Sequence, residues 1–142
     1  MANLFRFYHD AGLTNPVVSP LEFTIPVDHS SDPPDQVIFF GCPQQSPRIL
    51  ARAVSSPGVD ALQAEVIDAS PGSGHEATAA TFSDTSDFTG KVAGDPLSLG
   101  VEVLDGSANA KPVHVRFRDF TSVQGNSVEI SIGVLGIAEY DQ

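Results

Sequence analysis

Period-two alternation of apolar and polar residues is the feature that most constrains this chain, and it is clearest at residues 111–119. One side of this run carries Val113, Val115 and Phe117, and the other side carries His114, Arg116 and Arg118. Successive side chains of a β-strand point to opposite faces, so this pattern is typical of a strand with one face in a core and one in water. It predicts a half-buried strand here.

Similar runs recur along the chain and predict further strands. Alternation predicts strands at residues 21–27, 59–68, 97–103 and 128–134, with a weaker one at 76–82. The continuous apolar run 36–40, before Gly41, predicts a central strand covered on both faces. Residues 48–54 permit helical spacing, but Pro47 and Pro57 bound them closely, which favours a strand or irregular structure.

Glycine and proline are frequent between these runs. The chain has 12 glycines and 11 prolines, a density that breaks helices and favours short strands joined by turns. The sequence therefore predicts an all-β fold, an antiparallel β-sandwich of about seven to nine short strands. A closed barrel is the alternative.

Two pairings follow from short connections. Residues 59–68 and 76–82, joined by a glycine-containing loop, are expected to form a hairpin. The strands at 111–119 and 128–134 are expected to lie side by side, because consecutive strands usually do. Val113, Val115, Phe117, Val128, Ile130 and Ile132 would then share one core.

The length of 142 residues predicts one domain with a real core, since such a chain buries roughly 70% of the surface that it exposes when unfolded. Residues 1–15 are expected to form an N-terminal arm or a first short strand, and residues 16–142 a single β-sandwich domain. An aromatic arm of this kind packs under its own core or docks on a neighbouring subunit.

Charge and apolar content exclude some partners. Eighteen acidic residues against seven basic ones give a net charge of −11, which would repel nucleic acid and an anionic membrane surface. No apolar run is long enough for a signal peptide or a transmembrane helix. Cys42 is alone, so no intrachain disulfide is expected and folding suits a reducing cytoplasm. We expect Cys42 to be a small buried residue at a strand end.

The sequence offers no pattern typical of catalysis or of metal binding. The four histidines are scattered: His9, His29, His75 and His114. Two loops carry aspartates, at Asp28, Asp32 and Asp35 and at Asp84 and Asp87, but they lack the spacing of a calcium loop, so turn capping explains them better. Residues 71–76 place Ser, His and Glu together in a turn, without the strand–turn–helix setting of a nucleophile. We therefore expect no enzyme activity, cofactor or metal.

Three segments resemble strands of a known class of protein. They are Gln36-Val37-Ile38-Phe39-Phe40-Gly41, Asp95-Pro96-Leu97-Ser98-Leu99-Gly100 and Ala110-Lys111-Pro112-Val113-His114-Val115-Arg116. Together with the last strand they resemble structural proteins of tailed-bacteriophage virions. Similar patterns occur in bacterial surface β-sandwiches.

This resemblance implies an immunoglobulin-like fold and a role as a head decoration or cement protein. Such a protein binds the major capsid protein on the capsid surface, needs no cofactor and would be made in the host cytoplasm. The chain has neither Trp nor a cysteine pair, so an immunoglobulin-like assignment depends on strand pattern alone. A phage tail or fibre component and a bacterial cell-surface adhesion or carbohydrate-binding β-sandwich remain alternatives.

A homo-oligomer is expected, because several contacts on a capsid add avidity. Self-association of a chain this acidic would need its few basic residues at the contact, and large aromatic residues are favoured in interface cores. The candidate interface residues are therefore Leu4, Phe5, Arg6, Phe7, Tyr8, Lys111, Arg116 and Arg118. The alternative is that these bases only offset nearby acids on a solvated face.

Overall fold

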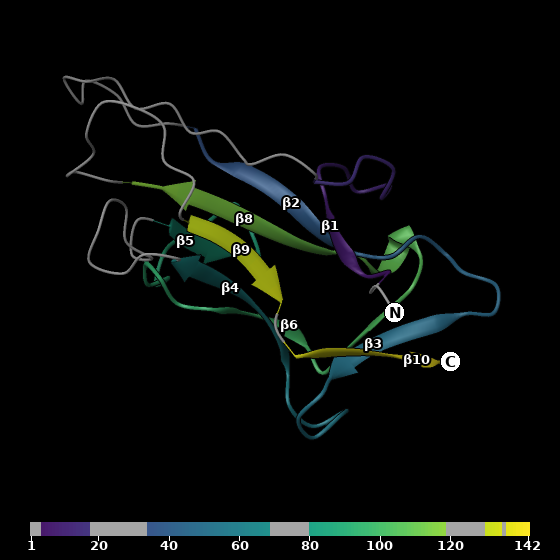
Figure 1. The fold of residues 1–142 in the computed structure, drawn as a ribbon. Coiled ribbons are helices and arrows are strands. Elements are labelled where there is room, and N and C mark those ends of the chain that lie inside the picture. The colour runs from purple at the N-terminus through teal and green to yellow at the C-terminus, as the bar shows by residue number, and fades with distance from the viewer. Residues whose placement is uncertain (1–3, 18–33, 69–79, 119–129, 135) are drawn as a thin grey trace.

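A computed structural model describes residues 4–17, 34–68, 80–118, 130–134 and 136–142 (Figure 1). The described part is all-β, as predicted, with one short 3₁₀ turn at Ser107–Asn109. Its ten strands are β1 (Arg6–Tyr8), β2 (Gln36–Gly41), β3 (Ile49–Ala53), β4 (Leu62–Asp68), β5 (Ala80–Ser83), β6 (Leu97–Gly100), β7 (Glu102–Leu104), β8 (Lys111–Phe117), β9 (Ile130–Val134) and β10 (Ile137–Asp141).

One layer is a four-stranded antiparallel sheet in the order β1-β2-β8-β5. Residues 111–117 form β8, and the predicted alternation is confirmed at its centre, where Val113 and Val115 are buried and His114 and Arg116 are half-buried. Phe117, which the alternation places in the core, is only half-buried. Strand β2 lies inside this sheet, as predicted, with Ile38 opposite Val113. Only one face of β2 is fully buried, however, so the prediction of a strand covered on both faces is wrong.

The other layer consists of two three-stranded sheets, β10-β3-β7 and β6-β4-β9. Each of the three chain segments that contributes a strand to one of these sheets also contributes a strand to the other. Residues 135–136 separate β9 from β10, and Val101 separates β6 from β7. The middle segment, β3 and then β4, pairs with both neighbours on either side of the break. Figure 1 shows β3 and β10 below the layer that holds β2 and β8.

The hydrophobic core lies between the two layers. Both contribute buried side chains, among them Ile38, Phe40, Phe82, Val113 and Val115 from one layer and Ala51, Leu62, Ala64, Leu99 and Val103 from the other. This two-layer packing agrees with a sandwich-like all-β fold. The segment at residues 48–54 forms β3, in agreement with the strand interpretation.

Both predicted pairings are wrong. Strand β4 pairs with β6 and β9, and β5 pairs with β8, so residues 59–68 and 76–82 form no hairpin. Strands β8 and β9 belong to different layers and meet across the core, where Ile132 packs partly buried against the cluster that contains Val113 and Val115. Short connections favour neighbours, but a chain can also cross from one layer of a sandwich to the other, as it does here.

The predicted strand at residues 97–103 is split. Gly100 adopts a φ of 94°, and the pairing of β4 with β6 shifts register between Leu62 and Gln63. A backbone irregularity of this kind turns the next residue away from the core. Val101, which the alternation places inward, is exposed instead. The predicted strand at 21–27 and residue Val128 lie outside the described residues.

Candidate functional site

The N-terminal aromatic residues are part of the protein's own fold. Strand β1 pairs with β2, and Phe5 and Tyr8 are only 4% and 6% exposed. The ring of Phe40 lies 6.2 Å from that of Phe5 and 5.3 Å from that of Phe7, centroid to centroid. Of the two alternatives for the arm, packing against its own core is therefore the observed one, and Phe5 and Tyr8 are not available as anchors in this conformation.

The same segment joins the two layers at one side of the molecule. The carboxylate of Glu139, on β10, accepts hydrogen bonds from the backbone N–H groups of Leu4, at 2.5 Å, and Phe5, at 3.1 Å. Both chain ends accordingly lie on the same side in Figure 1. Leu4 and Arg6 point outward and are exposed, so they are the accessible residues of the predicted arm.

The basic residues of β8 are engaged by neighbouring groups. Arg116 forms a two-pronged pair with the Asp35 carboxylate, at 3.0 and 2.9 Å, and its guanidinium lies 4.2 Å from the Phe88 ring centroid. Arg118 donates to the carbonyl of Phe117 at 2.8 Å and lies 3.9 Å from Asp35. Hydrogen bonding from Arg116 lowers the pKa of Asp35 below its usual value, although burial opposes this. The structure therefore agrees with the alternative interpretation of Arg116 and Arg118, that these bases offset nearby acids.

Lys111 has a different setting at the start of β8. Strand β5 pairs only with residues 114–117, so it does not cover this end of the strand. Lys111 lines a shallow hollow of about 270 Å³ with Asp84, Ser98, Leu99, Gly100 and Pro112. Lys111 and Arg6 form no ion pair with any residue that the structure describes.

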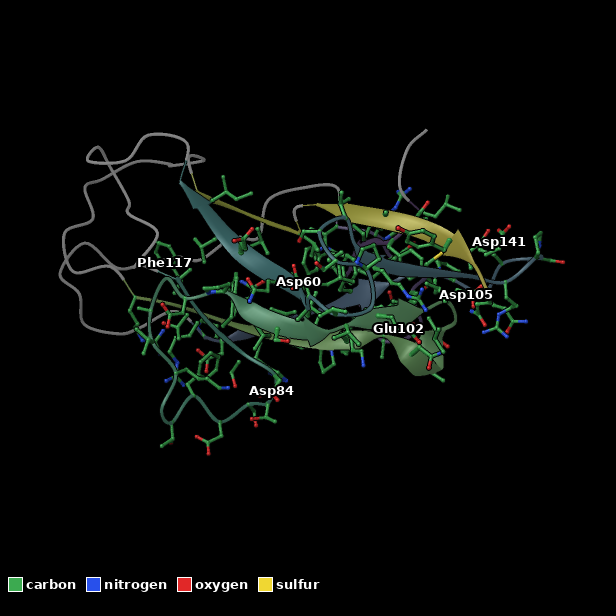
Figure 2. The ribbon with its side chains drawn as sticks, turned by 90° about the horizontal axis from the view of Figure 1, so that it is seen from below. Asp60, Asp84, Glu102, Asp105, Phe117 and Asp141 are labelled. Atoms are coloured by element: carbon green, nitrogen blue, oxygen red, sulfur yellow. The ribbon has the colours of Figure 1, made fainter. Side chains whose placement is uncertain are left out.

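Asp105 is the buried charged residue that the sequence reasoning missed. Its side chain is fully buried, and its two oxygens accept four hydrogen bonds. Figure 2 shows Asp105 at the same end of the molecule as Asp141, the last residue of β10. Oδ1 accepts from Arg48 Nε at 2.6 Å and from Gln142 Nε2 at 2.9 Å. Oδ2 accepts from the backbone N–H of Gln45 at 2.8 Å and of Ile49 at 3.3 Å.

Burial alone would raise the pKa of Asp105, but the hydrogen bonds from Gln45, Arg48 and Ile49 outweigh it and the net pKa is lowered. The carboxylate is therefore ionised near neutral pH, and each of its oxygens accepts two hydrogen bonds. It joins the loop before β3, the turn after β7 and the last residue of the chain. The sequence signal, Asp105-Gly106, indicated only the end of a strand. We assign Asp105 a structural role, because its oxygens are turned inward to donors of its own chain.

The remaining candidates also have structural settings. Cys42 follows β2 directly and is fully buried, as predicted, and burial raises the pKa of its thiol. Asp87 caps its own turn, accepting from the N–H of Thr89 at 2.9 Å, as predicted, whereas Asp35 pairs with Arg116. Among the residues described, no three His, Cys, Asp or Glu side chains converge as metal ligands would.

Several predicted residues lie outside the described ranges: His29, His75, Asp28, Asp32 and the turn at 71–76. Within those ranges no helix is long and apolar enough to cross a bilayer. Comparisons with protein-family models, with curated proteins and with solved structures return no match to this chain.

Proposed function

We propose that the protein is a non-enzymatic structural protein of a tailed-bacteriophage virion, of immunoglobulin-like fold, that binds the capsid surface and stabilises or decorates the head. The observation that carries the proposal is the position of the three resembling segments. They coincide with β2, β6 and β8, and β2 and β8 are paired neighbours across five residues. Two of the three segments, β2 and β8, thus form the centre of one sheet, and the third, β6, is an edge strand in the other layer.

Hydrogen bonds between segments that are distant in the sequence support this proposal. Glu139, on β10, accepts from the backbone N–H groups of Leu4 and Phe5, and Gln142 donates to Asp105 and to the carbonyl of Ile49. Contacts of this kind restrict local opening, which exposes a folded domain to proteolysis. A protein exposed on a particle surface outside the cell gains from this restriction.

The proposed assembly is a homo-oligomer on the major capsid protein. A net charge of −11 opposes contact between copies unless basic residues lie at that contact. Of the predicted interface residues, Arg6 and Lys111 are the bases that no described ion pair engages, and Leu4 is the exposed apolar one. We therefore assign the copy-to-copy contact to Leu4, Arg6 and Lys111, without Arg116 and Arg118.

Capsids purified from a phage deleted for this chain's gene test the proposal. Purified protein is added to them, and bound protein is measured by co-sedimentation and located by electron microscopy. We expect saturable, stoichiometric decoration of the capsid. Binding to isolated tails alone, or to the host cell surface alone, would replace the capsid assignment by the corresponding alternative.

Sedimentation velocity tests the copy-to-copy contact. Reversing both bases of the proposed contact, Arg6→Glu and Lys111→Glu, should convert the oligomer to monomer. The control reverses Arg52, which pairs with Glu102 at 2.9 Å in the other layer, away from the proposed contact. An oligomer that survives the double reversal, or that Arg52→Glu disrupts equally, contradicts this assignment.

A further inference from the structure

Residues 54–61 form a loop at the junction of the two sheets of the second layer. It lies between β3 and β4, the central segments of the second layer, and separates Ala53, opposite Ile137, from Leu62, opposite Gly100. Both flanking segments break at the same level, one at Val101 and the other between β9 and β10. In Figure 1 the loop extends below the molecule, away from β2 and β8.

Internal hydrogen bonds hold this loop in one shape. The carbonyl of Ser56 accepts from the N–H of Val59 at 2.9 Å and of Asp60 at 3.0 Å. The Ser55 hydroxyl donates to Asp60 at 2.8 Å, and the N–H of Val54 donates to the carbonyl of Gly136 at 2.6 Å. Ser56 adopts a φ of 45°, in the left-handed region that favours glycine. Strain of this kind persists only where surrounding contacts impose it, and it concentrates at functional sites.

The ordered loop presents apolar side chains to solvent. Val59 is 75% exposed and Val54 is 59% exposed, and Val101, at the break in the neighbouring strand, is 44% exposed. These three residues are half of the six large apolar residues that the described structure leaves exposed. A single exposed valine needs no explanation, but two on a pre-shaped loop and a third at the same level of the neighbouring strand are typical of a contact surface. We call Val54, Val59 and Val101 the loop patch.

We propose that the loop patch is the surface by which this protein docks on its partner, and that the partner offers an apolar pocket within a basic surface. This inference rests on the proposed function, under which the partner is the capsid protein. Asp60 is the charged residue of the loop itself, and it is acidic, as is the chain as a whole at −11. Two such acidic bodies repel, and Arg52, the base beside Gly58 of the loop, already pairs with Glu102 at 2.9 Å. A second copy is therefore a poor occupant, whereas a basic partner is attracted at long range.

The shape of the loop explains how so small a patch can bind. Ordering a flexible loop on binding costs free energy, and the internal hydrogen bonds of residues 55–60 remove that cost in advance. Few residues usually carry most of the binding energy of an interface, and they are packed into pockets of the partner. Val59, the most exposed of the three, is the residue that such a pocket would enclose.

Capsids that lack the protein also test this inference. The variant Val54→Ser/Val59→Ser should bind them at least about tenfold more weakly than wild type, because the side chains that fill the pocket are shortened and made polar. The matched control is Val92→Ser, in the loop between β5 and β6, where the native valine is 60% exposed. All three proteins should show the same circular dichroism spectrum and melting temperature, since no buried side chain changes.

The outcomes separate this inference from the proposed function. Wild type that binds capsids while the double variant binds equally well overturns the loop patch and leaves the capsid role intact. Wild type that binds tails instead overturns the capsid role, and the same variants then decide the loop patch on tails. Binding to neither overturns both.

Two further results bear on the partner's chemistry. Binding that weakens as salt rises from about 50 to about 500 mM supports a basic partner, and binding that does not weaken contradicts one. A double variant that changes the oligomeric state in sedimentation velocity, with capsid binding unchanged, shows that the occupant is a second copy.

Discussion

Asp105 should be the most sensitive charged residue in the described part of the protein. Asp105→Asn keeps the volume of the side chain but turns one of its acceptor oxygens into a donor. Oδ2 serves the backbone N–H groups of Gln45 and Ile49, which cannot turn away, so the new amide group should face Arg48 and Gln142. The hydrogen bonds from Arg48 and Gln142 are then lost, and the N–H groups of both residues face the N–H groups of the new amide.

The magnitude follows from these contacts. A hydrogen bond to a charged group contributes about 1.5–3 kcal/mol, and a buried donor left without a partner costs about 1–3 kcal/mol. Arg48 recovers part of this from water, since its side chain is 42% exposed. We therefore expect the free energy of unfolding to fall by about 2–4 kcal/mol in Asp105→Asn. Asp35→Asn, which breaks a two-pronged pair at the surface, should cost less than about 1 kcal/mol and is the matched control.

Urea unfolding followed by far-ultraviolet circular dichroism measures both variants, because the chain contains no Trp for fluorescence. With a slope of about 2 kcal/mol per molar urea, the midpoint of Asp105→Asn should fall by about 1–2 M. A loss no larger than that of Asp35→Asn would show that Asp105 is not the buried, four-bonded carboxylate described here.

The pH dependence gives a second check. The lowered pKa of Asp105 means that the unfolded chain takes up its proton first as the pH falls toward the ordinary value of about 3.9. Stability from this group is therefore present above that value and lost as the pH falls through the lowered pKa of the folded state. The difference between wild type and Asp105→Asn should shrink from pH 7 to about pH 3. A difference that stays constant would contradict the assignment of the pKa shift.

Three other outcomes can be measured in the same way. Phe40→Ala should lower the free energy of unfolding by about 3–5 kcal/mol, because Phe40 is buried and packs against two aromatic rings of the N-terminal segment. Phe117→Ala should lower it clearly less, because Phe117 is only half-buried, and equal losses would contradict the register of β8. Gly41→Ala should lower the melting temperature, since its new Cβ would lie 3.0 Å from Leu13 Cδ1 and 3.4 Å from the backbone of Ala110; an unchanged melting temperature would show that this contact yields. Cys42 should react with a thiol reagent only after urea unfolds the protein, because the thiol is buried and its pKa is raised; rapid reaction in native buffer would contradict this.

Local patterns in the sequence determined the class of the fold. The alternation in β8, the continuous apolar run of β2 and the density of glycine and proline depend only on side chains a few residues apart, and they predicted strands without helices. The same patterns predicted Cys42 as a buried residue after a strand and Asp87 as a turn cap, because burial at a strand end and side-chain capping are local effects.

Only the tertiary structure decided which strands meet and what the charged residues do. Strands β8 and β9 lie in different layers because pairing depends on contacts far apart in the chain, which period two does not encode. Val101 is exposed because a backbone irregularity at Gly100 interrupts the alternation. Asp105 is buried because donors from residues 45, 48, 49 and 142 converge on it, and no short stretch of sequence contains that set.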